Sequence, residues 1–264
     1  MPPVRWIDLC CPLCRGPGRL GLRTRRVVRL AAMALVGFAA AATGAAPANA
    51  CRLALALGVD ASRSVGPEAY DVQMQGIQAA LRAPDIRSAL LLPDAPVAFA
   101  LYEWSGRWQQ HVVIGWTMLD SPAAIDAVVA QLGAHERRFS GQTAVGRALF
   151  FGGRLLLGAP DCAARTLDLS GDGRNNDGPA PERIYARYNF GTITVNGLAI
   201  GGLEHDILDY YRDSVIRGPG AFVEYAQDWR DVPPVMHRKL LRELTVPMVS
   251  QLPGARAAQP GWRR

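Results

Sequence analysis

Lysine is almost absent from this chain of 264 residues, in which Lys239 is the only one. Enzymes that transfer phosphate through a strand-end aspartate usually need a lysine beside the phosphate. The sequence also lacks a Gly-x-Ser-x-Gly motif and a Ser-His-Asp set, and its four histidines show no metal-ligand spacing. These absences predict a protein that is not an enzyme.

A net charge is also missing from most of the chain. Residues 1–50 hold seven arginines and one aspartate, which accounts for the whole formal charge of +6, so residues 51–264 are balanced. A nucleic-acid-binding domain would need a basic face on the folded part. The sequence therefore predicts no nucleic-acid partner, and we expect a monomer.

No apolar run reaches the ~20 residues that span a bilayer. The apolar segment 30–42 follows an arginine-rich region and precedes Ala48-Asn49-Ala50, where small residues suit a signal peptidase. We predict a leader with a secretory signal peptide over residues 1–50, a domain over 51–246 and a flexible tail over 247–264, with export to the periplasm or beyond the cell. A retained membrane anchor is the alternative, and cysteines 10, 11 and 14 match no zinc site.

Only two cysteines, Cys51 and Cys162, follow the leader. Cys51 precedes Asp60 by nine residues, and Cys162 precedes Asp172 by ten. If the strands that lead to these aspartates are parallel neighbours, the two cysteines lie at the same end and can form a disulfide. Lipidation of Cys51 is the alternative, although Ala48-Asn49-Ala50 is a poor lipoprotein signal.

Hydrophobic periodicity predicts strands that alternate with helices. The expected strands are 53–59, 97–104, 111–117, 165–170, 192–200 and 221–226, and the expected helices are 68–82, 121–132, 144–157, 181–189, 206–215 and 234–244. The short gap after residue 104 predicts an antiparallel hairpin whose second strand lies at the sheet edge. We therefore predict a doubly wound α/β fold with a mostly parallel six-stranded sheet, one antiparallel edge strand and helices on both faces.

Short oxygen-bearing side chains gather where these strands end. Asp60, Ser62 and Ser64 follow the first strand, Thr143 precedes a helix, and Asp172 follows the fourth strand. In open α/β sheets, binding sites lie at the carboxyl ends of the strands. Carboxylate and hydroxyl oxygens suit Mg²⁺, which prefers about six oxygen ligands. A loop that merely caps the following helix is the alternative for the first three residues.

Asp-x-Ser-x-Ser followed by a Thr and then an Asp resembles the metal-ion-dependent adhesion site of von Willebrand factor A-type domains. The resemblance covers residues 52–245 and implies that Ser62, Ser64 and Thr143 bind Mg²⁺, or Mn²⁺, directly. Asp60 and Asp172 would act largely through water, and an open position would accept an Asp or Glu carboxylate of a partner protein. Residues next to these ligands are assigned a supporting role: Gly141, Gly171, Gly173 and Asn175.

Four further segments resemble an uncharacterised exported bacterial subfamily of these domains. They are residues 103–106, 139–143, 170–176 and 210–222. A metal-dependent binding module is the leading hypothesis, and a Mg²⁺-dependent hydrolase or phosphotransferase and a structural domain without metal are the alternatives. We further expect Asp168 to be a structural polar group and the tryptophans 104, 108 and 116 to pack the hairpin.

Overall fold

The computed structural model describes residues 51–93, 96–202 and 204–245. The predicted leader and the predicted tail lie outside these ranges. The strands are β1 (Cys51–Asp60), β2 (Val97–Trp104), β3 (Gln110–Met118), β4 (Cys162–Gly171), β5 (Thr194–Ile200) and β6 (Val223–Ala226). They form one sheet in the order β3-β2-β1-β4-β5-β6. Only the pair β2–β3 is antiparallel, and β3 lies at the edge, as predicted.

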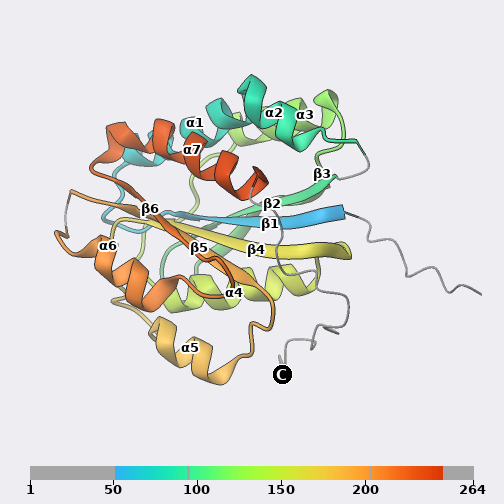
Figure 1. The fold of residues 1–264 in the computed structure, drawn as a ribbon. Helices are drawn as coiled ribbons and strands as arrows, with labels where there is room; N and C mark the ends of the chain where they lie inside the picture. The colour runs from blue at the N-terminus through green and yellow to red at the C-terminus, as the bar shows by residue number, and fades with distance from the viewer. Residues whose placement is uncertain (1–50, 94–95, 203, 246–264) are drawn as a thin grey trace, which may run out of the picture. The chain divides into compact units, whose positions relative to one another are not determined.

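Helices cover both faces of the sheet (Figure 1). One face carries α1 (Pro67–Arg82), α2 (Pro84–Leu90), α3 (Pro122–Gly133) and α7 (Val232–Thr245). The other carries α4 (Val145–Leu157), α5 (Pro181–Arg187), α6 (Ile207–Tyr210) and the π-helical turn Tyr211–Val215. A short 3₁₀ turn, Trp229–Asp231, leads into α7. The predicted fold class is confirmed, and the predicted helix 206–215 is divided into an α-helical and a π-helical part.

The central strand β1 explains where a site can form. Its residues are almost all buried because parallel neighbours flank it on both sides and helices cover both of its faces. From β1 the chain moves outward through β2 and β3 on one side and through β4, β5 and β6 on the other. The switch point of the sheet therefore lies between β1 and β4, where such folds bind ligands at the carboxyl edge.

The predicted disulfide joins the amino ends of these two central strands. Cys51 pairs with Cys162 in the β1–β4 register, their Cα atoms are 4.4 Å apart, and the two sulfur atoms are bonded. Because Cys51 Sγ is bonded to Cys162, it is not free to carry a lipid. A disulfide is typical of exported or extracellular proteins, because the cytosol keeps thiols reduced.

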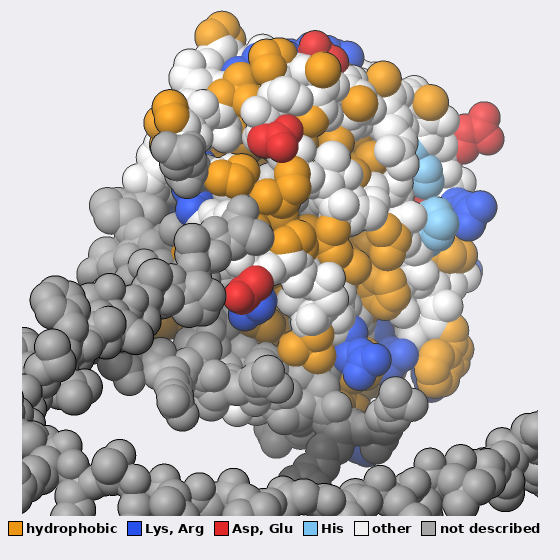
Figure 2. Space-filling model, turned by 90° about the vertical axis from the view of Figure 1, so that its right-hand side faces the viewer, with side chains coloured by type: hydrophobic (Ala, Val, Ile, Leu, Met, Phe, Trp, Pro, Cys, Tyr) orange, Lys and Arg blue, Asp and Glu red, His pale blue; other side chains and the backbone are white. Residues whose placement is uncertain are grey.

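Figure 2 shows the side of the molecule on which β1 and β4 begin. Hydrophobic and uncharged side chains occupy most of its described surface, and the visible charged side chains form small groups among them. Within the described residues, no helix combines the length and the apolar character needed to cross a bilayer.

Candidate metal site

The five predicted ligand positions come from three loops at the carboxyl edge of the sheet. Asp60 ends β1 and leads into the loop with Ser62 and Ser64, whereas Asp172 directly follows β4. Thr143 lies two residues before α4. Because β1 and β4 are parallel neighbours, Asp60 and Asp172 emerge at the same edge.

Hydrogen bonds join four of the five side chains into one cluster. Ser64 Oγ donates to Asp172 Oδ1 at 2.6 Å, and the Oγ atoms of Ser62 and Ser64 are 3.0 Å apart. The backbone N–H of Ser62 donates to Asp60 Oδ1 at 2.7 Å, which folds the loop back onto the carboxylate. Residues that are 108 positions apart in sequence, Ser64 and Asp172, are thus in direct contact.

Thr143 joins this cluster through the loop after β4. A Cβ placed on Gly173 would lie 3.6 Å from Thr143 Oγ1, so the threonine side chain faces the residue that follows Asp172. Asn176 Oδ1 accepts from the Thr143 N–H at 2.8 Å, and the Asn176 N–H donates to the Thr143 carbonyl at 2.9 Å. The structure therefore brings all five predicted positions to one edge, and Asn176 supports the Thr143 loop in addition to the predicted Asn175.

The predicted supporting residues each have a contact that explains their position. Asn175 Oδ1 accepts from the Gly146 N–H at 3.0 Å in the first turn of α4. The Gly141 carbonyl accepts from the Arg63 N–H at 2.7 Å, which ties two of the three loops together. At Gly171 a Cβ would lie 2.8 Å from Asp60 Oδ2, so only glycine lets the end of β4 approach this carboxylate without displacing it.

Asp60 and Asp172 are buried carboxylates. Both are at most 1% exposed, and among the described residues the Oδ2 atom of each has no hydrogen-bond partner. Burial, together with the charge of Asp172, raises the pKa of Asp60 to about 7, and burial also raises the pKa of Asp172. Burying carboxylates without partners is costly, and a divalent cation would remove that cost. The oxygen donors present therefore fit Mg²⁺ or Mn²⁺.

Hydroxyl groups are essential to this interpretation. Within the described residues, no group of three His, Cys, Asp or Glu side chains has a metal-binding arrangement. The candidate site contains only two carboxylates, and Ser62, Ser64 and Thr143 would supply the other protein oxygens. If both carboxylates act through water, no protein carboxylate would bind the ion directly.

One arginine that carries no motif signal holds the first loop in place. Arg137 donates from its two terminal nitrogens to the carbonyls of Ala61, Ser62 and Val65 at 2.7–2.8 Å. Its Nε donates to the Phe139 carbonyl at 2.7 Å, so the same guanidinium also holds the loop that leads to Thr143. This clamp fixes the backbone around Ser62 and Ser64 before any ligand arrives.

The buried carboxylate of Glu103 holds the chain next to Arg137. Glu103 Oε2 accepts from the Tyr70 hydroxyl at 2.9 Å and lies 3.1 Å from His135 Nε2, and Oε1 accepts from the Arg138 N–H at 3.1 Å. Glu103 therefore fixes the start of the loop that carries Gly141 and Thr143. The side chain of His135 is largely enclosed, with 12% of its surface exposed.

The single lysine is not available to a phosphate. Lys239 is fully buried in α7, where its Nζ lies 2.6 Å from Asp168 Oδ1 and 2.7 Å from Glu243 Oε1. Asp168 is thus a structural polar group, as expected. A phosphotransferase that used Lys239 would have to break this buried ion pair.

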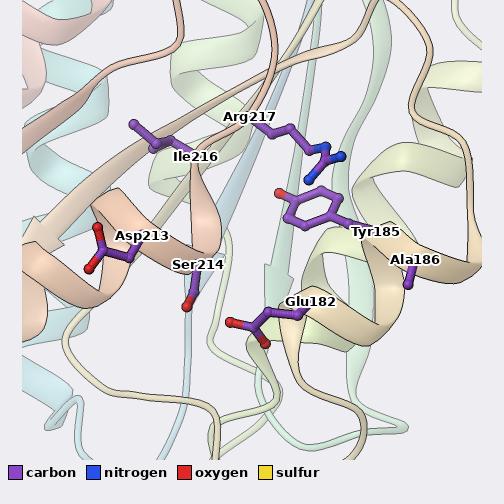
Figure 3. A pocket seen from close by; sticks show the side chains of 7 residues that line it. All are labelled: Glu182, Tyr185, Ala186, Asp213, Ser214, Ile216 and Arg217. Atoms are coloured by element: carbon purple, nitrogen blue, oxygen red, sulfur yellow. The ribbon is translucent and has the colours of Figure 1, made fainter.

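A pocket of about 280 Å³ lies elsewhere, between α5 and the π-helical turn. Figure 3 shows Arg217 and Tyr185 at one end and Glu182 and Ser214 at the other. The Arg217 guanidinium lies 4.7 Å from the centre of the Tyr185 ring. The pocket shares no residue with the candidate metal site.

Comparison with protein families gives one match, which spans residues 50–248 and carries the description "Protein of unknown function (DUF1194)". The chain belongs to the DUF1194 family. The matched segment contains the whole described domain and all five candidate ligands. No curated protein matches this DUF1194 chain.

Solved structures place the DUF1194 domain among von Willebrand factor A-like folds. A von Willebrand factor type A protein from Catenulispora acidiphila is similar with a TM-score of 0.52 and 18% identity, covering 74% of this chain and 43% of that one. The pilus adhesin SpaC from Lactobacillus rhamnosus GG gives 0.53 and 14%, covering 74% and 31%. Proximal thread matrix protein 1 of the mussel byssus, with a zinc-occupied metal-ion-dependent adhesion site, gives 0.51 and 17%, covering 74% and 46%.

These likenesses show the fold. The chain spans less than half the length of each of these structures. The predicted resemblance to von Willebrand factor A-type domains is confirmed, and the mussel byssus structure holds zinc in its own metal-ion-dependent adhesion site.

Proposed function

We propose that this DUF1194 protein is an exported, metal-dependent binding module and not an enzyme. It holds Mg²⁺, or Mn²⁺, through Ser62, Ser64 and Thr143, with Asp60 and Asp172 acting largely through bound water. The ion in turn binds an Asp or Glu carboxylate of a partner protein. The observation that carries this proposal is the pair of buried carboxylates, each with an unpartnered Oδ2, surrounded by hydroxyl groups from three loops.

The accessibility of the ligands supports an outward-facing coordination position. Asp60, Ser62, Thr143 and Asp172 are buried, whereas Ser64 is exposed, so the cluster opens to solvent on the side of Ser64. The two carboxylates are the only acidic groups in the proposed set. Because these two act through water, the ion would have no direct protein carboxylate ligand and would attract a carboxylate from outside to its open position.

Calorimetric titration with Mn²⁺ and with Mg²⁺ tests the metal site. We expect heat of binding for residues 51–264, and we expect the isosteric Asp60→Asn substitution to weaken binding about 10- to 100-fold, the range typical of groups that act through a metal's ligands. Asp161→Asn is the matched control, because Asp161 is exposed and directly precedes β4, next to the disulfide at the opposite edge.

The same titration, combined with an assay of phosphoester hydrolysis, separates the proposed binding module from its two alternatives. If the unaltered domain gives no heat with either ion, the candidate site does not bind metal and the domain is structural. If it binds metal and also hydrolyses phosphoesters in a manner that Asp60→Asn abolishes, the domain is an enzyme. Metal binding without turnover supports a binding module.

A further inference from the structure

Trp108 is the most exposed large hydrophobic side chain of the described residues. It is 79% exposed, compared with 49% for Leu92 and 40% for Leu157. The expectation that the hairpin tryptophans pack together is therefore wrong for Trp108, although it holds for Trp104, which is fully buried. Tryptophan is one of the side chains that contribute most to the binding energy of protein interfaces.

Hydrogen bonds place the turn that carries Trp108 beside the candidate metal site. Ser105 Oγ accepts from the Gly141 N–H at 2.7 Å, and the Ser105 carbonyl accepts from the Ala144 N–H at 3.0 Å. Arg107 donates to Asp177 from both its backbone and its side chain. The turn is therefore bound to the loop of Thr143 and to the loop of Asp172, and it is held rigidly at the same edge.

Two arginines at this edge have no carboxylate partner. Arg63 stands exposed between Ser62 and Ser64, and within the described residues no acidic side chain lies at ion-pair distance from it. Arg147 lies with its guanidinium 5.0 Å from the Trp108 ring centre and, within the same residues, has no acidic partner either. Arg107 differs from both, because Asp177 already neutralises it.

We propose that the partner is an acidic protein segment that carries a hydrophobic side chain. One carboxylate reaches the ion, further carboxylates contact Arg63 and Arg147, and an aromatic or aliphatic side chain covers Trp108. This inference rests on the metal-dependent binding proposed above and specifies its partner. Charge complementarity selects acidic segments and accelerates their approach, and the tryptophan supplies contact area at a small entropy cost.

Selection from a random 12-residue peptide library displayed on phage tests the partner chemistry. Peptides are captured by immobilised protein (residues 51–264) in Mn²⁺ and eluted with chelator. We expect the eluted peptides to share an Asp or Glu, to carry a net negative charge, and to include an aromatic or large aliphatic residue near it. A selected peptide is then synthesised and titrated against variants.

For that peptide we expect Trp108→Ala to weaken binding about tenfold or more, as truncation of an interface tryptophan does. Arg63→Gln and Arg147→Gln should each weaken it by less, about two- to fivefold, and should reduce its salt dependence. Leu157→Ala and Arg154→Gln are the controls, because both residues are exposed and lie towards the other end of α4, away from Trp108. All five variants should bind Mn²⁺ normally.

The outcomes distinguish this inference from the proposed function. If Mn²⁺ binds and the selected peptides lack acidic residues, or bind equally to the Trp108→Ala variant, the surface assignment is wrong while the metal site stands. Chelator-insensitive capture of anionic lipid vesicles in place of peptides also overturns it. If Mn²⁺ itself does not bind, both the proposed function and this inference fail.

Discussion

At the residue scale, the unusual feature is a buried carboxylate with no basic side chain at ion-pair distance among the described residues. Asp60 is fully buried and hydrogen-bonded only through Oδ1, and its pKa of about 7 is far above the usual value for an aspartate. A carboxyl group with a raised pKa in the folded state favours folding when it is protonated and opposes folding when it is charged. Without a bound ion, ionisation of Asp60 therefore lowers the stability of the folded domain.

This charge predicts a pH dependence of stability. With chelator present, stability should increase as the pH is lowered from 8 to 6, by about 1 kcal/mol from Asp60 alone, because the folded carboxyl group titrates near pH 7 and the unfolded one near 4. With saturating Mg²⁺ the trend should shrink or reverse, because protons compete with the ion. Thermal unfolding with and without chelator measures both effects.

Asp60→Asn is the control for this prediction. The variant should lose the contribution of Asp60, whereas Asp168, whose pKa burial also raises to about 7, should retain its own. Identical pH profiles for the variant and the unaltered protein would contradict the assignment.

At the scale of elements, a buried ionic cluster attaches α7 to the centre of the sheet. Lys239 and Glu243 of α7 meet Asp168 of β4, and Asn196 Nδ2 of β5 donates to Glu243 Oε1 at 2.8 Å. Burial alone would lower the pKa of Lys239, but the charges of Asp168 and Glu243 raise it. One ammonium group therefore stabilises two buried carboxylates.

Lys239→Met should destabilise the domain by about 3–5 kcal/mol, because it leaves both carboxylates buried without a cation. Guanidinium-induced unfolding measures the change. Arg238→Met is the matched control, because its ion pair with Glu224 lies at the surface, and it should cost at most about 1 kcal/mol. Adding Asp168→Asn and Glu243→Gln to Lys239→Met should restore part of the lost stability. Equal losses for the two single variants would show that the cluster contributes no more than a surface pair.

At the scale of the whole domain, the disulfide and the candidate metal site lie at opposite ends of the same two strands. Cys51 and Cys162 join the beginnings of β1 and β4, and Asp60 and Asp172 stand at their ends. The disulfide closes a loop between residues 111 positions apart, so it constrains most of the unfolded domain.

Cys51→Ser/Cys162→Ser should therefore reduce the free energy of unfolding by about 2–5 kcal/mol. Denaturant unfolding under non-reducing conditions measures the loss. Mn²⁺ affinity should change little at a temperature where the variant stays folded, because the site at the far ends of the strands retains its contacts. A variant as stable as the parent, or one that is folded but has lost metal binding, would contradict this separation.

Local patterns in the sequence were sufficient to predict the order of elements, the hairpin at the edge and the disulfide. A buried strand and an amphipathic helix each produce a periodic hydrophobic pattern in the sequence. The similar spacing of each cysteine from the following aspartate, nine and ten residues, indicates the register of two strands. The five candidate ligands were recognisable for a related reason: each stands directly at the end of a strand or before a helix, where position in sequence implies position at the edge.

Only the tertiary structure decided what surrounds those ligands. Arg137 carries no signal in sequence, because its partners are backbone carbonyls brought close by long-range packing. Ser105 and Asn176 lie in segments that resemble the subfamily, but their contacts with the Thr143 loop could not be read from the sequence. The exposure of Trp108 and the burial of Lys239 were likewise not predictable, since each depends on which distant segment covers the side chain. The sequence thus indicates which oxygen atoms could bind an ion. The tertiary structure determines how rigidly these atoms are held and which surface lies next to them.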